Sequence, residues 1–168
     1  MNRYFLTLSI RRDGYSAFGM ENPYATFPSG ALAWNLSDES FFNIKWINNL
    51  KVRASYGING NRDIGIYDAL AKLETNKYLT GSTLISGIYS SSLANQYLKW
   101  EKTKALNLGL DFSILNSRLN GSVDYYSMIT NDLLLKRSLP TIIGYDNVMS
   151  NMGELQNKGF EMTLNSYN

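Results

Sequence analysis

Six segments of the chain alternate large apolar residues with small or polar residues at a period of two. In residues 50–59 the apolar positions are Leu50, Val52, Ala54, Tyr56 and Ile58, and the intervening positions are Lys51, Arg53, Ser55, Gly57 and Asn59. The same period runs through residues 4–11, 29–37, 104–112, 119–126 and 158–165. Because successive side chains of a β-strand point to opposite faces, this period predicts an all-β fold of antiparallel strands, each with one apolar face.

The composition excludes several classes of function. The 168 residues include no cysteine and no histidine, which excludes disulfide scaffolds, Cys/His zinc sites, thiol nucleophiles and triads with an imidazole base. The formal net charge is only +2, so no basic surface for a nucleic acid or for an anionic lipid is expected from the overall charge. We therefore expect no catalytic residue, no metal site, no cofactor and no enzymatic activity.

The lengths of the links between the expected strands alternate along the chain. The long links are residues 12–28, 60–103 and 127–157, and the shorter ones are 38–49 and 113–118. Since successive antiparallel strands alternate direction, all long links would lie at one end of the sheet and the short ones at the other. This polarity is typical of outer-membrane barrels, which have long extracellular loops and short periplasmic turns.

Three local features inside the links are also expected from the sequence. Ser37, followed by two acidic residues, resembles the N-cap of a short helix in the first short link. Residues 67–73 are expected to form a turn or two of helix, and residues 133–135 to prolong the fifth strand. The first eight residues are too polar for the apolar core of a signal peptide, so no secretory signal is expected here.

Two other kinds of protein would show the same alternation. A soluble β-sandwich turns its apolar faces into a core, and an eight-stranded barrel would need two more strands within residues 78–97 or 133–148. Either could serve a structural or adhesive binding role. An enzyme that uses Asp111 and Asp124 as paired carboxylates is a further alternative. The one-sided loops and the low charge of 18% favour the membrane barrel over all of these.

Short motifs in a fixed order carry a resemblance to a known family. They include Ser9-Ile10-Arg11-Arg12-Asp13-Gly14, Phe27-Pro28-Ser29, Leu50-Lys51-Val52-Arg53-Ala54-Ser55-Tyr56-Gly57, Leu98-Lys99-Trp100-Glu101, Asn107-Leu108-Gly109-Leu110-Asp111, Gly121-Ser122-Val123-Asp124-Tyr125-Tyr126 and Asn157-Lys158-Gly159-Phe160-Glu161. In order and spacing the chain resembles the SusC/RagA-type TonB-dependent outer-membrane transporters of Bacteroidetes.

The resemblance implies a specific architecture and setting. Residues 1–168 would be part of a TonB-dependent receptor β-barrel domain: about six strands from the C-terminal half of a plugged barrel of the roughly 22-stranded class. The plug domain, the signal peptide and the terminal strand would be missing, so the chain would be a fragment without a function of its own. It would reside in the cell outer membrane and contact outer-membrane lipid. A SusD-like surface lipoprotein would act as a lid, the TonB system would act through the missing plug, and the ligand would be an oligosaccharide or a peptide.

Two sets of side chains are candidates for contact with a transported ligand. The first consists of the charged residues on the polar strand faces, which would line the lumen: Arg11, Lys51, Arg53, Asp111, Asp124 and Glu161. The second consists of tyrosines in the longest loop, which could stack on sugar rings or meet the lid protein: Tyr67, Tyr78, Tyr89 and Tyr97. These tyrosines could equally pack the loop against itself.

Overall fold

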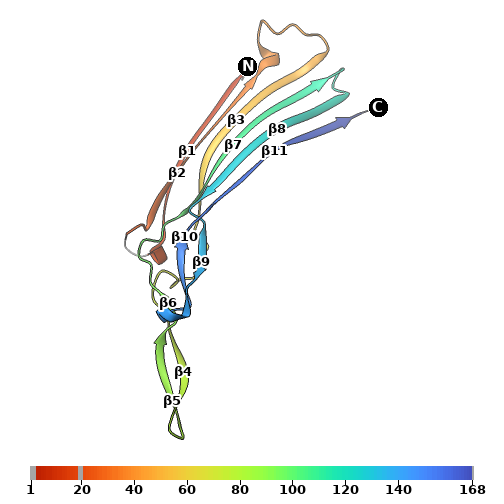
Figure 1. The fold of residues 1–168 in the computed structure, drawn as a ribbon. Coiled ribbons are helices and arrows are strands. Elements are labelled where there is room, and N and C mark those ends of the chain that lie inside the picture. The colour runs from red at the N-terminus through yellow and green to blue at the C-terminus, as the bar shows by residue number, and fades with distance from the viewer. Residues whose placement is uncertain (1–2, 19–20, 168) are drawn as a thin grey trace.

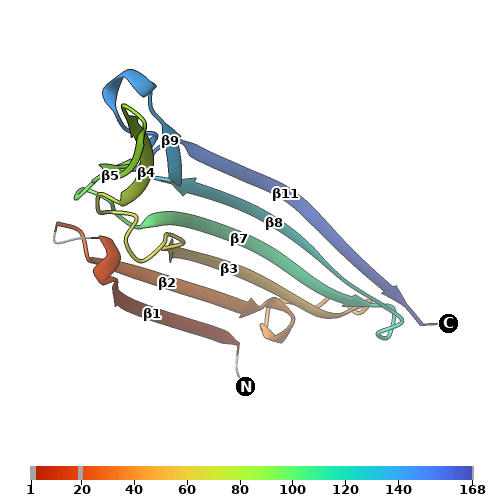
Figure 2. The same cartoon turned by 90° about the horizontal axis from the view of Figure 1, so that it is seen from below.

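The computed structural model describes residues 3–18 and 21–167, and its main element is an open, six-stranded antiparallel sheet (Figures 1 and 2). In spatial order the strands are β1 (Tyr4–Gly14), β2 (Tyr24–Asn35), β3 (Ile47–Asn61), β7 (Glu101–Ile114), β8 (Leu119–Asn131) and β11 (Glu154–Ser166). All six expected strands are confirmed. Five of them cover the whole expected segment and extend beyond it at one or both ends. The exception is β2, which begins five residues earlier than expected and ends at Asn35, two residues before the predicted end. The sheet does not close into a barrel.

The register of the six strands separates their side chains into two faces. One continuous row of paired residues is Leu6, Leu32, Ala54, Leu108, Tyr125 and Phe160, and the adjacent row on the other side is Phe5, Ala33, Arg53, Gly109, Asp124 and Glu161. We call the side that carries the first row the apolar face and the side that carries the second row the polar face. The alternation of the sequence therefore becomes a two-sided sheet.

The apolar face is uncovered by any described part of the chain. Leu8 and Ile10 on β1 are each 75% exposed, and Phe160 on β11 is 78% exposed. A β-sandwich would require a second sheet stacked about 10 Å above these residues. The remaining strands instead continue beyond one end of the six-stranded sheet, as Figure 1 shows. The sandwich alternative is therefore not the fold of this chain.

The short links lie together at one end of the sheet, where β1 begins and β11 ends (Figure 1). The first contains a 3₁₀ helix, η2 (Leu36–Asp38), which begins two residues earlier than the sequence predicted. Its N-cap is Asn35 rather than Ser37, and no side chain caps it; Ser37 Oγ instead donates to Asn49 Oδ1 at 3.2 Å. The second short link is the tight turn of residues 115–118 between β7 and β8.

The expected alternation of link lengths holds only in part. β1 and β2 remain paired up to Gly14 and Tyr24, so the first loop shrinks to residues 15–23 and is shorter than the link of residues 36–46. The predicted alternation of link lengths fails here because β1 continues through Arg12 and Asp13, beyond the end of the apolar period in its sequence. The other two loops, residues 62–100 and 132–153, are long and lie at the same end as the first.

These two long loops form their own β-structure. A hairpin of β4 (Leu73–Thr80) and β5 (Thr83–Ser90) projects farthest from the main sheet, and a small sheet joins β6 (Ser92–Leu93), β10 (Asn147–Asn151) and β9 (Leu134–Ser138) (Figure 1). The segments proposed for extra barrel strands thus do contain strands, but these do not join the main sheet. The eight-stranded barrel is therefore not formed. Two 3₁₀ turns, η1 (Ser16–Phe18) and η3 (Thr141–Ile143), complete the loops.

Two local expectations for the loops were wrong. Residues 66–69 form hydrogen-bonded turns rather than a helix, and the chain is extended from Leu73 onward. Residues 133–135 do not prolong β8, because Asp132 adopts a left-handed conformation with φ of 59° and redirects the chain into β9. Aspartate tolerates this conformation better than most residues.

A compact apolar cluster joins the loops to the end of the sheet. Phe18 and Leu98 are fully buried, and Trp100 and Phe27 are each 4% exposed. The ring of Trp100 lies 5.3 Å from that of Phe18 and 5.5 Å from that of Phe27, in the tilted and edge-on arrangements that aromatic pairs favour. Residues from the first loop, from the loop of residues 62–100 and from β2 therefore share one core: Phe18, Ala25, Phe27, Ile64, Ala69, Leu98 and Trp100.

Across the described residues, no helix is long and apolar enough to cross a membrane.

Candidate functional site

The central feature of the polar face is an ion cluster that spans three strands. Arg53 on β3 donates from Nε and Nη2 to the two carboxylate oxygens of Asp111 on β7, each at 2.8 Å. The same Nη2 donates to Asp124 Oδ1 on β8 at 2.9 Å. Two-pronged contacts of this kind fix the guanidinium plane more firmly than a single contact would. The cluster therefore holds β3, β7 and β8 in register from the polar side.

Gly109 on β7 makes this cluster sterically possible. Gly109 lies between Arg53 and Asp124 in the paired row of the polar face. A Cβ at this position would lie 2.8 Å from both Cζ and Nη2 of Arg53 and closer still to the carboxylate of Asp124. Any side chain here would push the guanidinium and the carboxylate apart. The glycine thus gives Arg53 a path across β7 to β8.

A shallow pocket of about 600 Å³ opens beside the ion cluster on the polar face. Glu161, directly across from Asp124 on β11, is on its wall, and the Tyr126 ring lies so close to Gly159 that a Cβ there would be 2.8 Å from the tyrosine hydroxyl. The lining residues are Arg53, Ser55, Asn107, Asp124, Tyr126, Met128, Asn157 and Glu161. The pocket thus combines an aromatic ring with amide, hydroxyl and carboxylate groups that can form hydrogen bonds with a polar ligand.

The structure brings only part of the first candidate set together. Arg53, Asp111 and Asp124 are in direct contact, and Glu161 is their cross-strand neighbour. Lys51 is on the same face, but its ammonium lies 5.6 Å from the centre of the Phe5 ring on β1. Arg11 is farther along β1, where it pairs with Asp13 at 3.0 Å and lies 5.5 Å from the centre of the Phe27 ring.

The four candidate tyrosines are distributed over the long loop. Tyr67 and Tyr97 are in turns and are 66% and 75% exposed. Tyr78 on β4 and Tyr89 on β5 share one face of the hairpin, and Tyr78 lies over Gly87. The Tyr89 hydroxyl donates to Glu74 at 3.3 Å, and the negative charge of that carboxylate raises the pKa of Tyr89. Tyr78 and Tyr89 are therefore on the same face of the hairpin, whereas Tyr67 and Tyr97 are outside it.

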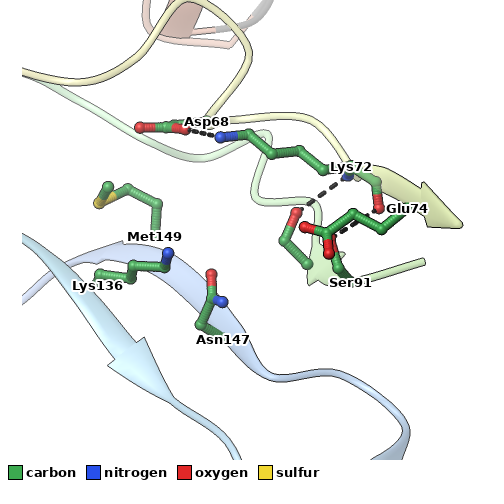
Figure 3. A pocket seen from close by; sticks show the side chains of 8 residues that line it. Asp68, Lys72, Glu74, Ser91, Lys136, Asn147 and Met149 are labelled. Carbon is green, nitrogen blue, oxygen red and sulfur yellow. Dashed lines mark hydrogen bonds and ion pairs between the residues drawn. The ribbon is translucent and has the colours of Figure 1, made fainter. Parts of the chain in front are cut away.

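A smaller pocket of about 140 Å³ is at the base of the hairpin (Figure 3). Lys72 contacts Asp68, and this contact lowers the pKa of the aspartate. The backbone N–H of Lys72 donates to Ser92 Oγ at 3.0 Å, and the backbone N–H of Ser91 donates to the carbonyl of Lys72 at 2.8 Å. Lys136 and Asn147 face these groups from β9 and β10. These bonds fasten the hairpin to the small sheet.

The paired carboxylates of the enzyme alternative are part of the ion cluster. Asp111 and Asp124 both accept hydrogen bonds from Arg53. Ion pairing with this arginine is therefore sufficient to explain why the two carboxylates lie close together. Within the described ranges, no group of three or more acidic residues is placed to hold a metal ion.

Sequence reasoning missed several residues of this region. Asn107 and Tyr126 share the polar pocket with Arg53, and Gly109 admits the guanidinium. All three occupy alternate positions on strands that were correctly predicted, so the period of two could have placed them on this face. The buried cluster around Trp100 had no such signal, because its members come from separate loops.

Comparisons with known proteins agree with this architecture. Residues 1–168 match the family described as "TonB dependent receptor-like, beta-barrel". The chain is 44% identical over 168 residues to TonB-dependent receptor P3 of Formosa agariphila, and 38% identical over 173 residues to TonB-dependent receptor SusC of Bacteroides thetaiotaomicron. Each alignment covers 99% of this chain but only 17% of the relative.

A solved structure shows the same arrangement of strands. The RagAB peptide transporter superposes with a TM-score of 0.84 at 31% sequence identity, over 96% of this chain and 18% of the transporter chain. The chain therefore corresponds to less than a fifth of the length of these relatives, which are receptors and transporters. The open two-faced sheet, the sequence matches and the superposition lead to one conclusion: this chain belongs to the TonB-dependent receptor β-barrel family and represents a part of such a barrel.

Proposed function

We propose that this chain forms wall strands and extracellular loops of a SusC-like, TonB-dependent importer in the outer membrane of a Gram-negative bacterium. The apolar face contacts lipid, the polar face lines the lumen, and the long loops face the cell exterior. The observation that carries the proposal is the exposed apolar face of a sheet whose strands match the barrel family. In a barrel wall this face needs no protein cover, because lipid covers it.

The ligand is an oligosaccharide or a peptide that passes along the polar face. This proposal is supported by the polar pocket beside Arg53, whose amide and carboxylate groups can exchange hydrogen bonds with a hydrated ligand. Arg11, Lys51, Asp111, Asp124 and Glu161 share this face and complete the candidate lumen lining. This role does not require these strands to make or break a covalent bond, and the proposal therefore assigns the chain no enzymatic activity.

The hairpin is the proposed contact for a SusD-like lid. It projects beyond the small sheet, and among residues 3–18 and 21–167 its two strands pair only with each other (Figure 1). Two-stranded hairpins are marginally stable alone, so this one gains stability from a partner surface. Tyr78 and Tyr89 offer that partner an aromatic face, and Tyr67 and Tyr97 are proposed as further contacts. Energy from TonB would arrive through a plug domain elsewhere in the polypeptide.

Introduced cysteines can test the orientation of the sheet, because this segment has none of its own. Ser55→Cys on the polar face and Leu108→Cys on the apolar face are placed in the native polypeptide that contains this sequence, in outer-membrane vesicles. A water-soluble maleimide should label Ser55→Cys, and a lipid-soluble maleimide should label Leu108→Cys. The reverse pattern, or recovery of the polypeptide outside the outer membrane, would refute the proposal.

A further inference from the structure

The charged residues of the apolar face are all at its loop end. Within the paired residues of the six strands, the bases on this face are Arg12, Lys102, Lys104 and Lys158, and the one acid is Glu154. The half of this face toward the short links carries only uncharged side chains. By contrast, the polar face mixes bases with the acids Asp13, Glu101, Asp111, Asp124 and Glu161. The positive charge on the apolar face is therefore confined to one boundary.

Two of these bases flank strand β8. Lys104 is in register with Ile129, and Lys158 is in register with Ser127, two residues farther along the same face. Adjacent strands lie about 4.8 Å apart and each residue rises about 3.4 Å along a strand, so the Cα atoms of the two lysines are separated by about 10 Å across β8 and about 7 Å along it, or about 12 Å in all. A lysine side chain extends about 6 Å from its Cα, so both ammonium groups can reach one group placed above β8. Ser127 and Gln156 provide a hydroxyl and an amide in the same area.

Neither lysine is neutralised by the protein. Both side chains are exposed, and none of the ion pairs among residues 3–18 and 21–167 includes Lys104 or Lys158. Arg11 and Arg53 on the polar face, in contrast, each pair with an aspartate. We define the boundary patch as Lys104, Ser127, Gln156 and Lys158. Its two cations, hydroxyl and amide are all donors of the kind that a phosphate accepts.

An apolar surface begins directly below this patch. Phe160 follows Lys158 on the same face and is 78% exposed, and its ring lies 4.9 Å from that of Tyr125. Met162 and Leu164 continue the apolar column along β11 and are 68% and 53% exposed. One column of the face thus presents cationic and polar donors first and an aromatic and aliphatic surface after them. An amphiphile with a phosphorylated head and acyl chains has the same order of chemistry.

We propose that the boundary patch binds the phosphate of a phosphorylated glycolipid of the outer leaflet, while Tyr125 and Phe160 pack against its acyl chains. This inference rests on the proposed function, because it needs the loop end of the apolar face to meet the outer leaflet. Charge complementarity favours this occupant over an uncharged lipid. The bound glycolipid fixes the depth and rotation of these strands at the membrane surface.

The test uses the native polypeptide, extracted from outer membranes in mild detergent, with bound phosphorylated glycolipid counted by mass spectrometry. The double variant Lys104→Gln/Lys158→Gln should retain roughly 25-fold less glycolipid, because each surface lysine contributes about a factor of five toward an anionic lipid. Lys104→Arg/Lys158→Arg should retain it. Lys45→Gln/Lys77→Gln removes the same charge from a short link and from the hairpin, and it should bind as the unmodified protein does.

Three outcomes would overturn the inference. They are equal retention by the Lys104→Gln/Lys158→Gln variant, equal binding of enzymatically dephosphorylated glycolipid, and equally effective displacement by phosphatidylglycerol at matched phosphate. The last would mean a surface for any anionic lipid. Membrane fractionation distinguishes a failure of this inference from a failure of the proposed function. If the Lys104→Gln/Lys158→Gln variant reaches the outer membrane and keeps its glycolipid, only the inference about the boundary patch is refuted. A polypeptide absent from the outer membrane refutes both.

Discussion

Single residues decide whether the strands of this wall stay in register, and Gly109 is the clearest example. Gly109→Ala should separate Arg53 from Asp124, because the added Cβ would lie 2.8 Å from the guanidinium. The loss of a partly exposed charged hydrogen bond predicts a destabilisation of about 1–2 kcal/mol. Denaturant unfolding of the native barrel would measure it.

Gly30→Ala is the matched control for this substitution. It adds the same methyl group to β2, where the nearest atom is the flexible end of Leu8 at 3.3 Å. The two glycine variants should therefore differ in stability. Equal stability of Gly109→Ala and Gly30→Ala would show that the ion cluster contributes nothing to the register of β3, β7 and β8.

A second residue-scale prediction concerns Glu39 in the first short link. Its carboxylate accepts hydrogen bonds from Tyr4 Oη at 2.5 Å and from Trp34 Nε1 at 3.1 Å, and it pairs with Arg3 at 3.2 Å. The hydrogen bonds from Tyr4 and Trp34, followed by the charge of Arg3, lower the pKa of Glu39. The stabilisation is therefore present above the pKa of the unfolded chain and is lost as pH falls through the lower, folded pKa.

Acidification should thus loosen the short-link end of the sheet, and Glu39→Gln should remove this pH dependence. The intrinsic fluorescence of the native barrel at pH 7 and below pH 4, with Trp34 as reporter, would measure the change. Asp38→Asn, on the same 3₁₀ turn, is the control and should titrate as the unmodified protein does. A Glu39→Gln barrel with unchanged acid sensitivity would contradict the prediction.

At the scale of elements, the hairpin of β4 and β5 is separable from the wall. Leu73 and Ser90 are paired, so the two ends of the hairpin are adjacent and can be closed by a short glycine turn. Replacing residues 74–89 in this way should leave barrel assembly intact and reduce co-purification of the lid lipoprotein. Heat-modified gel mobility would report assembly. If lid binding survived the replacement, the hairpin would not be the lid contact.

The elements also show where sequence reasoning succeeds and where it fails. Alternation identified all six strands because each meets two different environments, which impose a period of two on residues such as Leu108 and Asn107. It failed for β9, where Asp132 turns the chain through a left-handed conformation that apolar neighbours do not signal. It failed also for the loop cluster, since the contacts of Trp100 with Phe18 and Phe27 join residues far apart in sequence.

The candidate site residues were likewise predicted only in part. The period of two placed Arg53, Asp111 and Asp124 on one face, but their contact depends on register, which pairs Arg53 with Gly109 and Gly109 with Asp124. Strand register is set by pairing along the whole strand and by its turns, so one chain segment does not encode it alone. The scattered positions of Tyr67 and Tyr97 have the same origin, because loop packing depends on several segments at once.

At the scale of the whole molecule, the sheet formed by the described residues has two unpaired edges, on β1 and β11. Each unpaired backbone group in hydrocarbon costs several kcal/mol, so the 168 residues alone should not insert into a bilayer. Expressed alone and diluted into detergent micelles, they should form aggregates that proteases digest. The native polypeptide, refolded in parallel, should give a protease-resistant barrel. A resistant, monomeric product from the 168 residues would contradict this expectation.

The register of the sheet also bears on how such a chain can change during evolution. β8 pairs with β7 and β11 over nearly its whole length without an interruption. Inserting or deleting one residue within β8 would exchange the two faces beyond that point and expose Asp124 to the side that now holds Tyr125. Length variation is therefore tolerated in the loops and penalised in the strands. Related proteins can therefore diverge in the length and sequence of their surface loops while the lengths of the paired strands stay the same.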